Sequence, residues 1–294
     1  MERPFTAARR LQPPDAGPGG PARRWSAAPH TAVMAQPPLL EFRNVTVDHG
    51  VFRGLHDLTL AIHAGEHTAI VGPNGSGKST LLKVLMREMY PRLLDPPPMV
   101  RILGRENWPL FDLRAVLGII TNDLAETCRK PYSARETVLS GFFGSIGLWP
   151  NHQVAPAMEA KADELMELLE ITHLAERHMT AMSSGEVRRA VVARALVHDP
   201  QAIILDEPTN SLDVRAAREL RRVLRTLAQS GITIILVTHH LPDIIPEIER
   251  VVCLKRGRLV ADGPKSEILN AEALSALFGT QVEVMETSGY YHMW

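Results

Sequence analysis

Cysteine is scarce in this chain, which carries only Cys128 and Cys253 among its 294 residues. Two cysteines so far apart exclude a disulfide framework, and Cys253 lies in an apolar run, where we expect a small core residue. No run of about 18 or more apolar residues occurs, so the chain is not expected to span a membrane alone. The twelve histidines show no spacing typical of metal ligands.

An excess of either charge is also missing, since the formal net charge is -1. This balance gives no electrostatic footprint of a nucleic-acid-binding surface, and direct nucleic-acid binding is not expected. A hydrophobic content of 45% with 22% charged residues is ordinary for a soluble globular protein. The composition therefore predicts a single cytosolic enzyme domain with tails.

The ends of the chain differ in composition from the middle. Residues 1–38 are rich in Pro, Ala, Gly and Arg without helical or strand periodicity, which predicts a disordered tail. An organelle transit peptide is the alternative for an arginine-rich start, but the prolines argue against it. Equally, Met34 could be the true start, because the regular pattern begins at Leu39. Residues 280–294 are assigned to a C-terminal tail.

The most informative segment follows a short apolar strand, residues 67–71, and matches G-x-x-x-x-G-K-[ST]. Its glycines allow backbone N–H groups to point at phosphates, and the next helix adds its positive end. Lys78 is expected to reach the β- and γ-phosphates, and Ser79 to coordinate Mg²⁺. A plain glycine-rich turn would need all these residues in register by chance. The predicted nucleotide-binding residues are Gly72, Pro73, Asn74, Gly75, Ser76, Gly77, Lys78, Ser79 and Thr80.

A second apolar strand, residues 202–205, ends in Asp206 and Glu207. A continuous apolar run suits a strand covered on both faces, and ligands bind at the carboxyl ends of such strands. Asp206 is expected to serve the Mg²⁺ shell and Glu207 to orient or deprotonate the attacking water. A helix N-cap is the alternative for these acids, but the upstream phosphate loop favours catalysis. The two strands predict an α/β P-loop fold.

Between these motifs, residues 182–190 read MSSGEVRRA and resemble the signature of the ATP-binding-cassette (ABC) ATPases. The resemblance covers residues 39–279 and follows the family's order from phosphate loop to signature, acidic strand and Thr238-His239. It implies that signature residues bind ATP, that Asp213 couples two nucleotide sites and that His239 contacts the γ-phosphate. His49 falls where the family stacks an aromatic ring on adenine, although a plain strand-end histidine is equally compatible. The signature residues are Ser183, Ser184, Gly185 and Glu186.

Several positions depart from the family pattern. Asn122 stands where the family has a glutamine, one methylene longer, that contacts Mg²⁺ and water. Ser184 replaces a glycine, and strain is expected there if the backbone needs a positive φ. Glu186 replaces a glutamine, and Ser183-x-x-Glu186 also fits a helix capping box. The signature and residues 239–244 are similar to the subset that includes molybdate-type transport ATPases.

The resemblance and the hydrophobic periodicity together predict the architecture. We expect N-terminal antiparallel strands at 40–45 and 56–62, a core helix at 79–89, and a helical insertion at about 123–198. An amphipathic helix is predicted for 156–169 and a hairpin for 251–261. The apolar segment 141–149 contains Phe142, Phe143 and Trp149, which could contact a permease or belong to the insertion's own core.

One phosphate loop and one signature per chain imply, by the resemblance, a head-to-tail homodimer closed by ATP. The expected function is ATP hydrolysis that energises a membrane transporter, with the chain on the inner face of the membrane, held by an integral-membrane permease. The alternative is a soluble ATP-driven switch that remodels a protein or nucleic-acid complex. Neither the transported substrate nor its direction follows from the residues.

Overall fold

The computed structural model describes residues 36–49 and 52–294, without the side chains of residues 49, 52 and 53. Most of the predicted N-terminal tail and the alternative start at Met34 lie outside these residues. The chain divides into two units, residues 1–36 and 37–294, and every described helix and strand belongs to the second unit.

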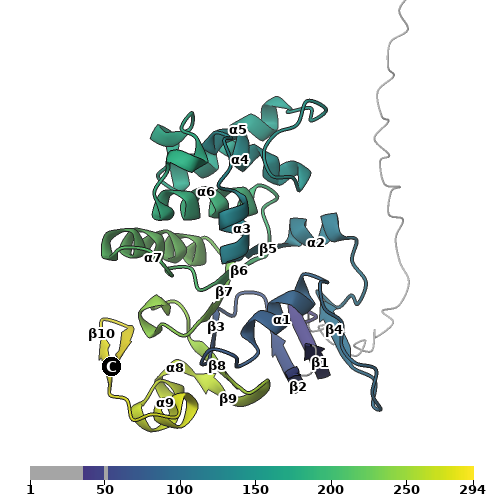
Figure 1. Cartoon of the computed structure of the whole chain (residues 1–294), viewed down its shortest axis with the longest axis vertical. Coiled ribbons are helices and arrows are strands. Elements are labelled where there is room, and N and C mark those ends of the chain that lie inside the picture. The colour runs from purple at the N-terminus through teal and green to yellow at the C-terminus, as the bar shows by residue number, and fades with distance from the viewer. Residues whose placement is uncertain (1–35, 50–51) are drawn as a thin grey trace, which may run out of the picture. The chain divides into compact units, whose positions relative to one another are not determined.

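The central sheet has the strand order β5-β6-β7-β3-β8-β9. Its strands are β3 (Thr68–Val71), β5 (Leu117–Ile120), β6 (Ala202–Asp206), β7 (Thr233–Thr238), β8 (Arg250–Lys255) and β9 (Arg258–Pro264). All neighbouring pairs are parallel except β8 and β9, which form the predicted hairpin. The carboxyl ends of β3 and β6 therefore lie on the same edge, where the phosphate loop and the acids follow (Figure 1).

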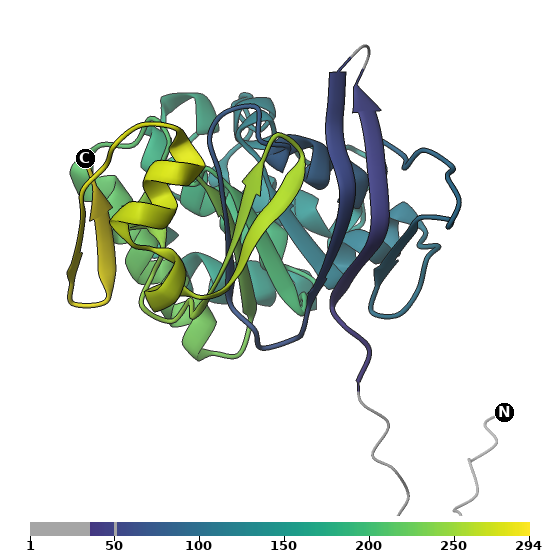
Figure 2. The ribbon, with the colours of Figure 1, turned by 90° about the horizontal axis from the view of Figure 1, so that it is seen from below.

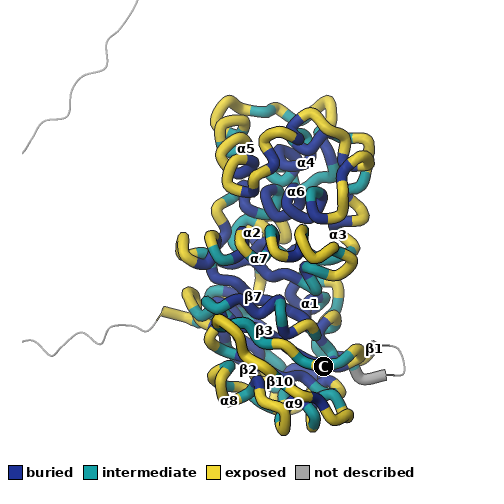
Figure 3. Tube along the Cα trace, turned by 90° about the vertical axis from the view of Figure 1, so that its left-hand side faces the viewer, coloured by how far each residue is buried: buried dark blue, intermediate teal, exposed yellow. Residues whose placement is uncertain are grey.

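Alternating side chains of the central strands enter two different cores. In β7, Ile234 and Leu236 belong to one hydrophobic cluster and Ile235 and Val237 to the other, as the two-residue period of a strand requires. A strand covered on both faces needs an unbroken apolar sequence, and every residue of β7 is buried. Figure 3 shows buried residues both in the strands and in helices α4 (Ala134–Leu139) and α6 (Ser184–Leu196).

One cluster packs the central sheet against helix α1 (Lys78–Leu85) and an antiparallel sheet of order β2-β1-β4. This second sheet contains β1 (Leu40–His49), β2 (Phe52–Ile62) and β4 (Met99–Ile102), and it confirms the predicted N-terminal strands. Helix α1 ends four residues earlier than predicted. Arg87 has φ 61°, in the left-handed region, and such a residue cannot continue a right-handed helix.

The other cluster contains the helices of the segment predicted as an insertion. These helices are α3 (Asn122–Thr127), α4 (Ala134–Leu139), α5 (Pro156–Leu168) and α6 (Ser184–Leu196), with short turns η1 (Ser140–Phe143), η2 (Thr172–Leu174) and η3 (Met179–Ala181). They gather at one end of the unit in Figure 1. Ala162, Leu165 and Met166 of α5 are buried on one face, which agrees with its predicted periodicity. Helix α7 (Val214–Gln229) contacts both α6 and β7, and helix α2 (Leu110–Val116) contacts β5.

The C-terminal segment folds onto the core. After η4 (Leu241–Asp243), α8 (Lys265–Ile268) and α9 (Ala271–Phe278), the strands β10 (Val284–Thr287) and β11 (Tyr290–Met293) form an antiparallel hairpin (Figure 2). Tyr290, Tyr291 and Met293 pack against the core cluster, so much of the segment assigned to a tail is ordered structure. No helix among the described residues combines the length and apolarity needed to cross a bilayer.

Candidate functional site

The phosphate loop leaves β3 and enters α1 through a backbone that only glycine accommodates. Gly77 has φ 109°, and a Cβ there would lie 2.6 Å from the Gly54 carbonyl oxygen. Gly77 is also the N-cap of α1 and offers no side-chain cap, so the first N–H groups of the helix remain available to an anion. Ser76 is 1% exposed, and its hydroxyl has no hydrogen-bond partner among the described residues. The loop therefore presents several donors that lack an internal acceptor.

Lys78 lies folded over this loop. Its Nζ donates to the carbonyl oxygens of Gly72, at 2.6 Å, and Pro73, at 3.3 Å. The same ammonium is 3.8 Å from Glu207 Oε1. Burial lowers the pKa of Lys78, while the charges of Glu207 and Asp206 act in the opposite direction. The loop lysine and the strand-end acid, about 130 residues apart in sequence by the numbering, thus share one site.

Glu207 is held at the end of β6 by three donors from the end of β7. Its Oε2 accepts from Thr238 Oγ1 at 3.1 Å and from the His239 N–H at 3.3 Å. Its Oε1 is 2.7 Å from His239 Nδ1. Adjacent parallel strands bring these residues together, because Asp206 pairs with Val237 in register. The structure therefore places the predicted catalytic residues Glu207, His239 and Lys78 in one contact network.

The predicted magnesium residues line a common cavity. Ser79, Asn122 and Asp206 all border a space of about 680 Å³ that begins at the phosphate loop. Burial raises the pKa of Asp206 to about 6, with a further contribution from Glu207 and opposition from Lys78 and Arg188. Asn122 Oδ1 accepts a hydrogen bond from Arg188 Nη2. An ionised oxygen, a hydroxyl and an amide that meet in one cavity match the ligand preference of Mg²⁺.

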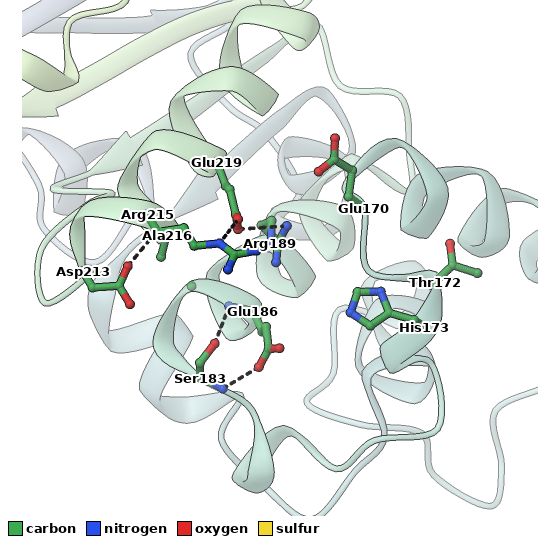
Figure 4. Close-up of a pocket in the computed structure, with 11 residues that line it drawn as sticks. Glu170, Thr172, His173, Ser183, Glu186, Arg189, Asp213, Arg215, Ala216 and Glu219 are labelled. Carbon is green, nitrogen blue, oxygen red and sulfur yellow. Dashed lines mark hydrogen bonds and ion pairs between the residues drawn. The ribbon is translucent and has the colours of Figure 1, made fainter.

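Ser183, Gly185 and Glu186 of the signature border a different cavity, of about 720 Å³ (Figure 4), whereas Ser184 does not line it and accepts from Arg129 Nη2 at 3.0 Å. Ser183 is the N-cap of α6, and it forms a capping box in which its N–H donates to Glu186 Oε2 at 2.7 Å. Asp213 caps α7 beside it by accepting from the Ala216 N–H at 2.8 Å. Ser183, Gly185, Glu186 and Asp213 thus belong together, whereas the phosphate loop does not contribute to this cavity.

One expectation about the signature changes in the structure, and the expected capping box of Ser183 and Glu186 is confirmed. Ser184 is the first residue of α6 and is absent from the residues with positive φ, so the expected strain does not occur. Instead, its neighbour needs the small side chain: a Cβ at Gly185 would lie 2.6 Å from Ala216 Cβ of α7. The carboxylate of Glu186 is engaged by Ser183. Partial burial raises its pKa, but the Ser183 hydrogen bonds and nearby arginines outweigh this, and the pKa is lowered.

Several residues of the site were not found from the sequence. Thr209 Oγ1 donates to Asp243 Oδ2 at 2.6 Å, and Arg221 Nη1 donates to Asp243 Oδ1 at 3.2 Å. These contacts tie the segment after Glu207, η4 and α7 together around a carboxylate that is 2% exposed. Arg188 was also missed, and the available signal was an arginine pair inside a helix of otherwise small and apolar residues. His49 ends β1, but its side chain lies outside the described residues.

The apolar segment 141–149 divides between the core and the surface. Phe142 packs against His198 with ring centroids 5.4 Å apart, and Phe143 stacks on His152 at 4.2 Å. Trp149 is 58% exposed. The lining of the 680 Å³ cavity also includes Gly141, Gly144 and Ile146, together with Leu110 and His198. We refer to the part of the cavity lined by these five residues as the insertion groove. Ser79 and Asp206 line the same cavity.

Comparisons with known proteins agree with this architecture. A family model described as ABC transporter matches residues 55–210. The hemin import ATP-binding protein HmuV of Rhodopseudomonas palustris (strain HaA2) is 34% identical over 264 residues, which cover 85% of this chain and 94% of the relative. The phosphonates import ATP-binding protein PhnC 1 of the same strain is 31% identical over 236 residues, covering 78% and 82%. A dimeric post-hydrolysis ATP-binding cassette bound to ADP and Pi is similar with a TM-score of 0.63 at 25% identity, covering 76% of this chain and 98% of that structure.

Fold and site together define a nucleotide-binding protein of the P-loop class. More particularly, this chain belongs to the ABC transporter family as an ATP-binding subunit. It is an ATPase that energises a membrane transporter.

Proposed function

We propose that ATP binds on the phosphate loop, with Lys78 on the β- and γ-phosphates, Glu207 as the group that orients or deprotonates water, and His239 on the γ-phosphate. The support is the contact network that joins these three side chains. Such a base is most effective when a second group orients it, and Thr238 supplies an additional hydrogen bond to Glu207. The hydroxyl of Ser76, buried and without an internal partner among the described residues, fits a loop that donates to phosphate oxygens.

Mg²⁺ is the cation that fits beside this loop. Ser79 and Asp206 would hold it, and Asn122 would lie in the same shell, because these three residues border one cavity. When bound, the cation would neutralise phosphate charge during transfer. Lys78, whose ammonium lies over the loop, would supply a second positive charge.

The catalytic assembly is a head-to-tail homodimer. Each chain holds its signature residues in a cavity that the phosphate loop does not reach. A two-fold arrangement brings Ser183 and Gly185 of one protomer onto the ATP bound by its partner. Both protomers then use the same surface, so the dimer is closed. Asp213, at the rim of the signature cavity, then lies close to the dimer contact. The similarity to a dimeric cassette supports this assembly.

Coupling to transport takes place at the insertion groove. The observation that carries this proposal is its continuity with the cavity of Ser79, Asn122 and Asp206, because a partner seated in the groove touches the wall that surrounds the nucleotide. Leu110 is 47% exposed in the groove and Phe111 beside it is 52% exposed, which suits an apolar segment of an integral-membrane permease. The chain would act at the cytoplasmic face, and the hemin and phosphonate relatives favour import.

The test is copurification from gently solubilised membranes with ATP present. A tagged Glu207→Gln chain is expected to retain a multi-helix membrane protein in near-stoichiometric yield. Adding Leu110→Asp should remove that protein without loss of ATP binding. Met285→Asp is the matched control, since Met285 is 50% exposed on β10, outside the groove. Recovery from the soluble fraction with only itself or a soluble complex would overturn transport coupling and favour an ATP-driven switch.

A further inference from the structure

A buried arginine lies beside the magnesium residues. Arg188 is 5% exposed within α6, a helix whose residues from Val187 to Ala193 are all buried. Its Nη2 donates to Asn122 Oδ1. Its Nη1 is buried and has no hydrogen-bond partner in the part of the chain that the structure describes. A guanidinium stays charged in proteins, and removing it from water costs several kcal/mol unless nearby charges compensate.

The compensating charge is Asp206. Burial lowers the pKa of Arg188, whereas the carboxylates of Asp206 and then Glu126 raise it. The reciprocal interaction appears at Asp206, where Arg188 is one of two positive groups that oppose its raised pKa. The guanidinium of Arg188 is buried and contacts Asn122, one of the residues that line the cavity of Ser79 and Asp206.

Its neighbour in sequence serves the other half-site. Arg189 is 9% exposed, borders the signature cavity and lies 3.5 Å from Glu219 of α7. Consecutive residues of an α-helix are separated by about 100° around its axis. Two adjacent buried arginines thus project from α6 toward the two nucleotide half-sites of the same chain, one on the side of the signature cavity and the other on the side of Asn122.

We propose that Arg188 is a positioning residue of the ATPase reaction: it holds Asn122 Oδ1 and so fixes the short amide at the magnesium side of the nucleotide site. The inference rests on the proposed assignment of Ser79, Asp206 and Asn122 to that side. An amide oxygen has two lone pairs, so one remains for the site when Arg188 occupies the other. The side chain of asparagine is one methylene shorter than that of glutamine and reaches less far. The orientation of the Asn122 amide therefore matters more for its contact with the magnesium side. The same contact links the helix that begins at the signature to the chain's own magnesium side.

The test is a double-mutant cycle on the full chain, with ATPase kcat, KM, the Kd for ATP and the Mg²⁺ concentration for half-maximal activity as readouts. Removal of a residue that orients a metal-site ligand typically costs about 10- to 100-fold. Arg188→Ala and Asn122→Ala should each lower kcat and raise the Mg²⁺ requirement within this range, with the Kd for ATP changed by less than about threefold. The double variant should be no worse than the poorer single variant by more than about twofold, because both changes remove one contact. Arg188→Lys should restore little, since an ammonium lacks the guanidinium fork.

Arg225→Ala is the matched control, because Arg225 of α7 pairs with Glu247 at 2.8 Å, away from the nucleotide site. Its Mg²⁺ requirement should equal that of the wild type. If Arg188→Ala does not fold, the cycle is measured with Arg188→Lys and Arg188→Gln. Additive losses, or an unchanged Mg²⁺ requirement in the Arg188 variants, would overturn the proposal. Ser79→Ala separates the role of Arg188 from the assignment of the magnesium side. If Ser79→Ala alters the Mg²⁺ requirement while the Arg188 variants do not, only the role of Arg188 fails. If Ser79→Ala has no effect on the Mg²⁺ requirement, the magnesium side itself is wrongly assigned.

Discussion

Replacing Glu207 by glutamine tests the chemical assignment directly, because the two side chains have nearly the same shape. Glutamine keeps one oxygen that can accept from Thr238 Oγ1, now at 3.1 Å, or from the His239 N–H. It cannot accept a proton from water. A positioned general base contributes about 10²- to 10⁴-fold, which corresponds to about 2.7 to 5.4 kcal/mol of barrier. We therefore expect hydrolysis to slow by about a hundredfold or more.

ATP binding should survive this substitution. The carboxylate of Glu207 lies 3.8 Å from Lys78 Nζ and raises the pKa of Asp206, so its removal takes one negative charge away from the place where a triphosphate binds. Slow hydrolysis with intact binding should accumulate the ATP-bound dimer, seen as an earlier peak in size-exclusion chromatography.

The assay is phosphate release under saturating ATP, with nucleotide affinity measured separately by fluorescence. Glu167→Gln is the matched control, because Glu167 lies exposed on α5 and should leave both quantities unchanged. Turnover within about tenfold of the wild type, well short of the expected loss, would refute Glu207 as the base.

Three single contacts lead to further predictions. Lys78→Ala should abolish ATP binding in equilibrium dialysis, because it removes the ammonium proposed to contact the β- and γ-phosphates, which here donates to the loop carbonyls of Gly72 and Pro73. Gly185→Ala should lower the free energy of unfolding by about 1–3 kcal/mol, since the new methyl would lie 2.6 Å from Ala216 Cβ. Gly263→Ala serves as its control in a urea titration, because a methyl there would meet Ile268 only at an ordinary 3.8 Å. Glu186→Gln keeps the capping box but removes a carboxylate whose pKa is lowered in the folded protein. The wild type should therefore be more stable than Glu186→Gln by about 0.3–1 kcal/mol near neutral pH. In urea titrations this difference in unfolding free energy should disappear as the pH falls from about 4.3, the unfolded value, through the lower pKa of the folded protein. A difference that persisted in acid would contradict the role of the charge.

The phosphate loop and the strands around it could be predicted because their signals are local. Gly77, Lys78 and the apolar strand before them are close together in sequence. The same holds for the capping box of Ser183 and Glu186, which lie three residues apart. Glu207 and His239 were expected near the same phosphate only through the family resemblance, and the register of β6 against β7 explains their direct contact.

Contacts set by packing could not be read in this way. Asn122 and Arg188 are 66 residues apart, and their meeting depends on how α6 lies against β5 and α3. The need for glycine at 185 depends on Ala216 of another helix, so the sequence favoured strain at Ser184 instead. The C-terminal hairpin likewise looks like a tail until Tyr290 and Tyr291 are found against the core.

The polar contacts also differ between the two sides of the site. On the core side, Asp243 binds both Thr209 and Arg221, a buried network that ties the loop after Glu207 to α7 and η4. On the insertion side, the polar link from α6 to the magnesium residues is the contact between Arg188 and Asn122. Breaking one partner of a buried charged network costs about 3–5 kcal/mol, whereas a single hydrogen bond to a charged group contributes about 1.5–3 kcal/mol. Separating Asn122 from Arg188 therefore breaks one hydrogen bond, whereas moving the loop after Glu207 breaks two contacts to a buried carboxylate. We accordingly expect the position of Asn122, which lines the cavity of Ser79 and Asp206, to change more readily than that of the loop after Glu207.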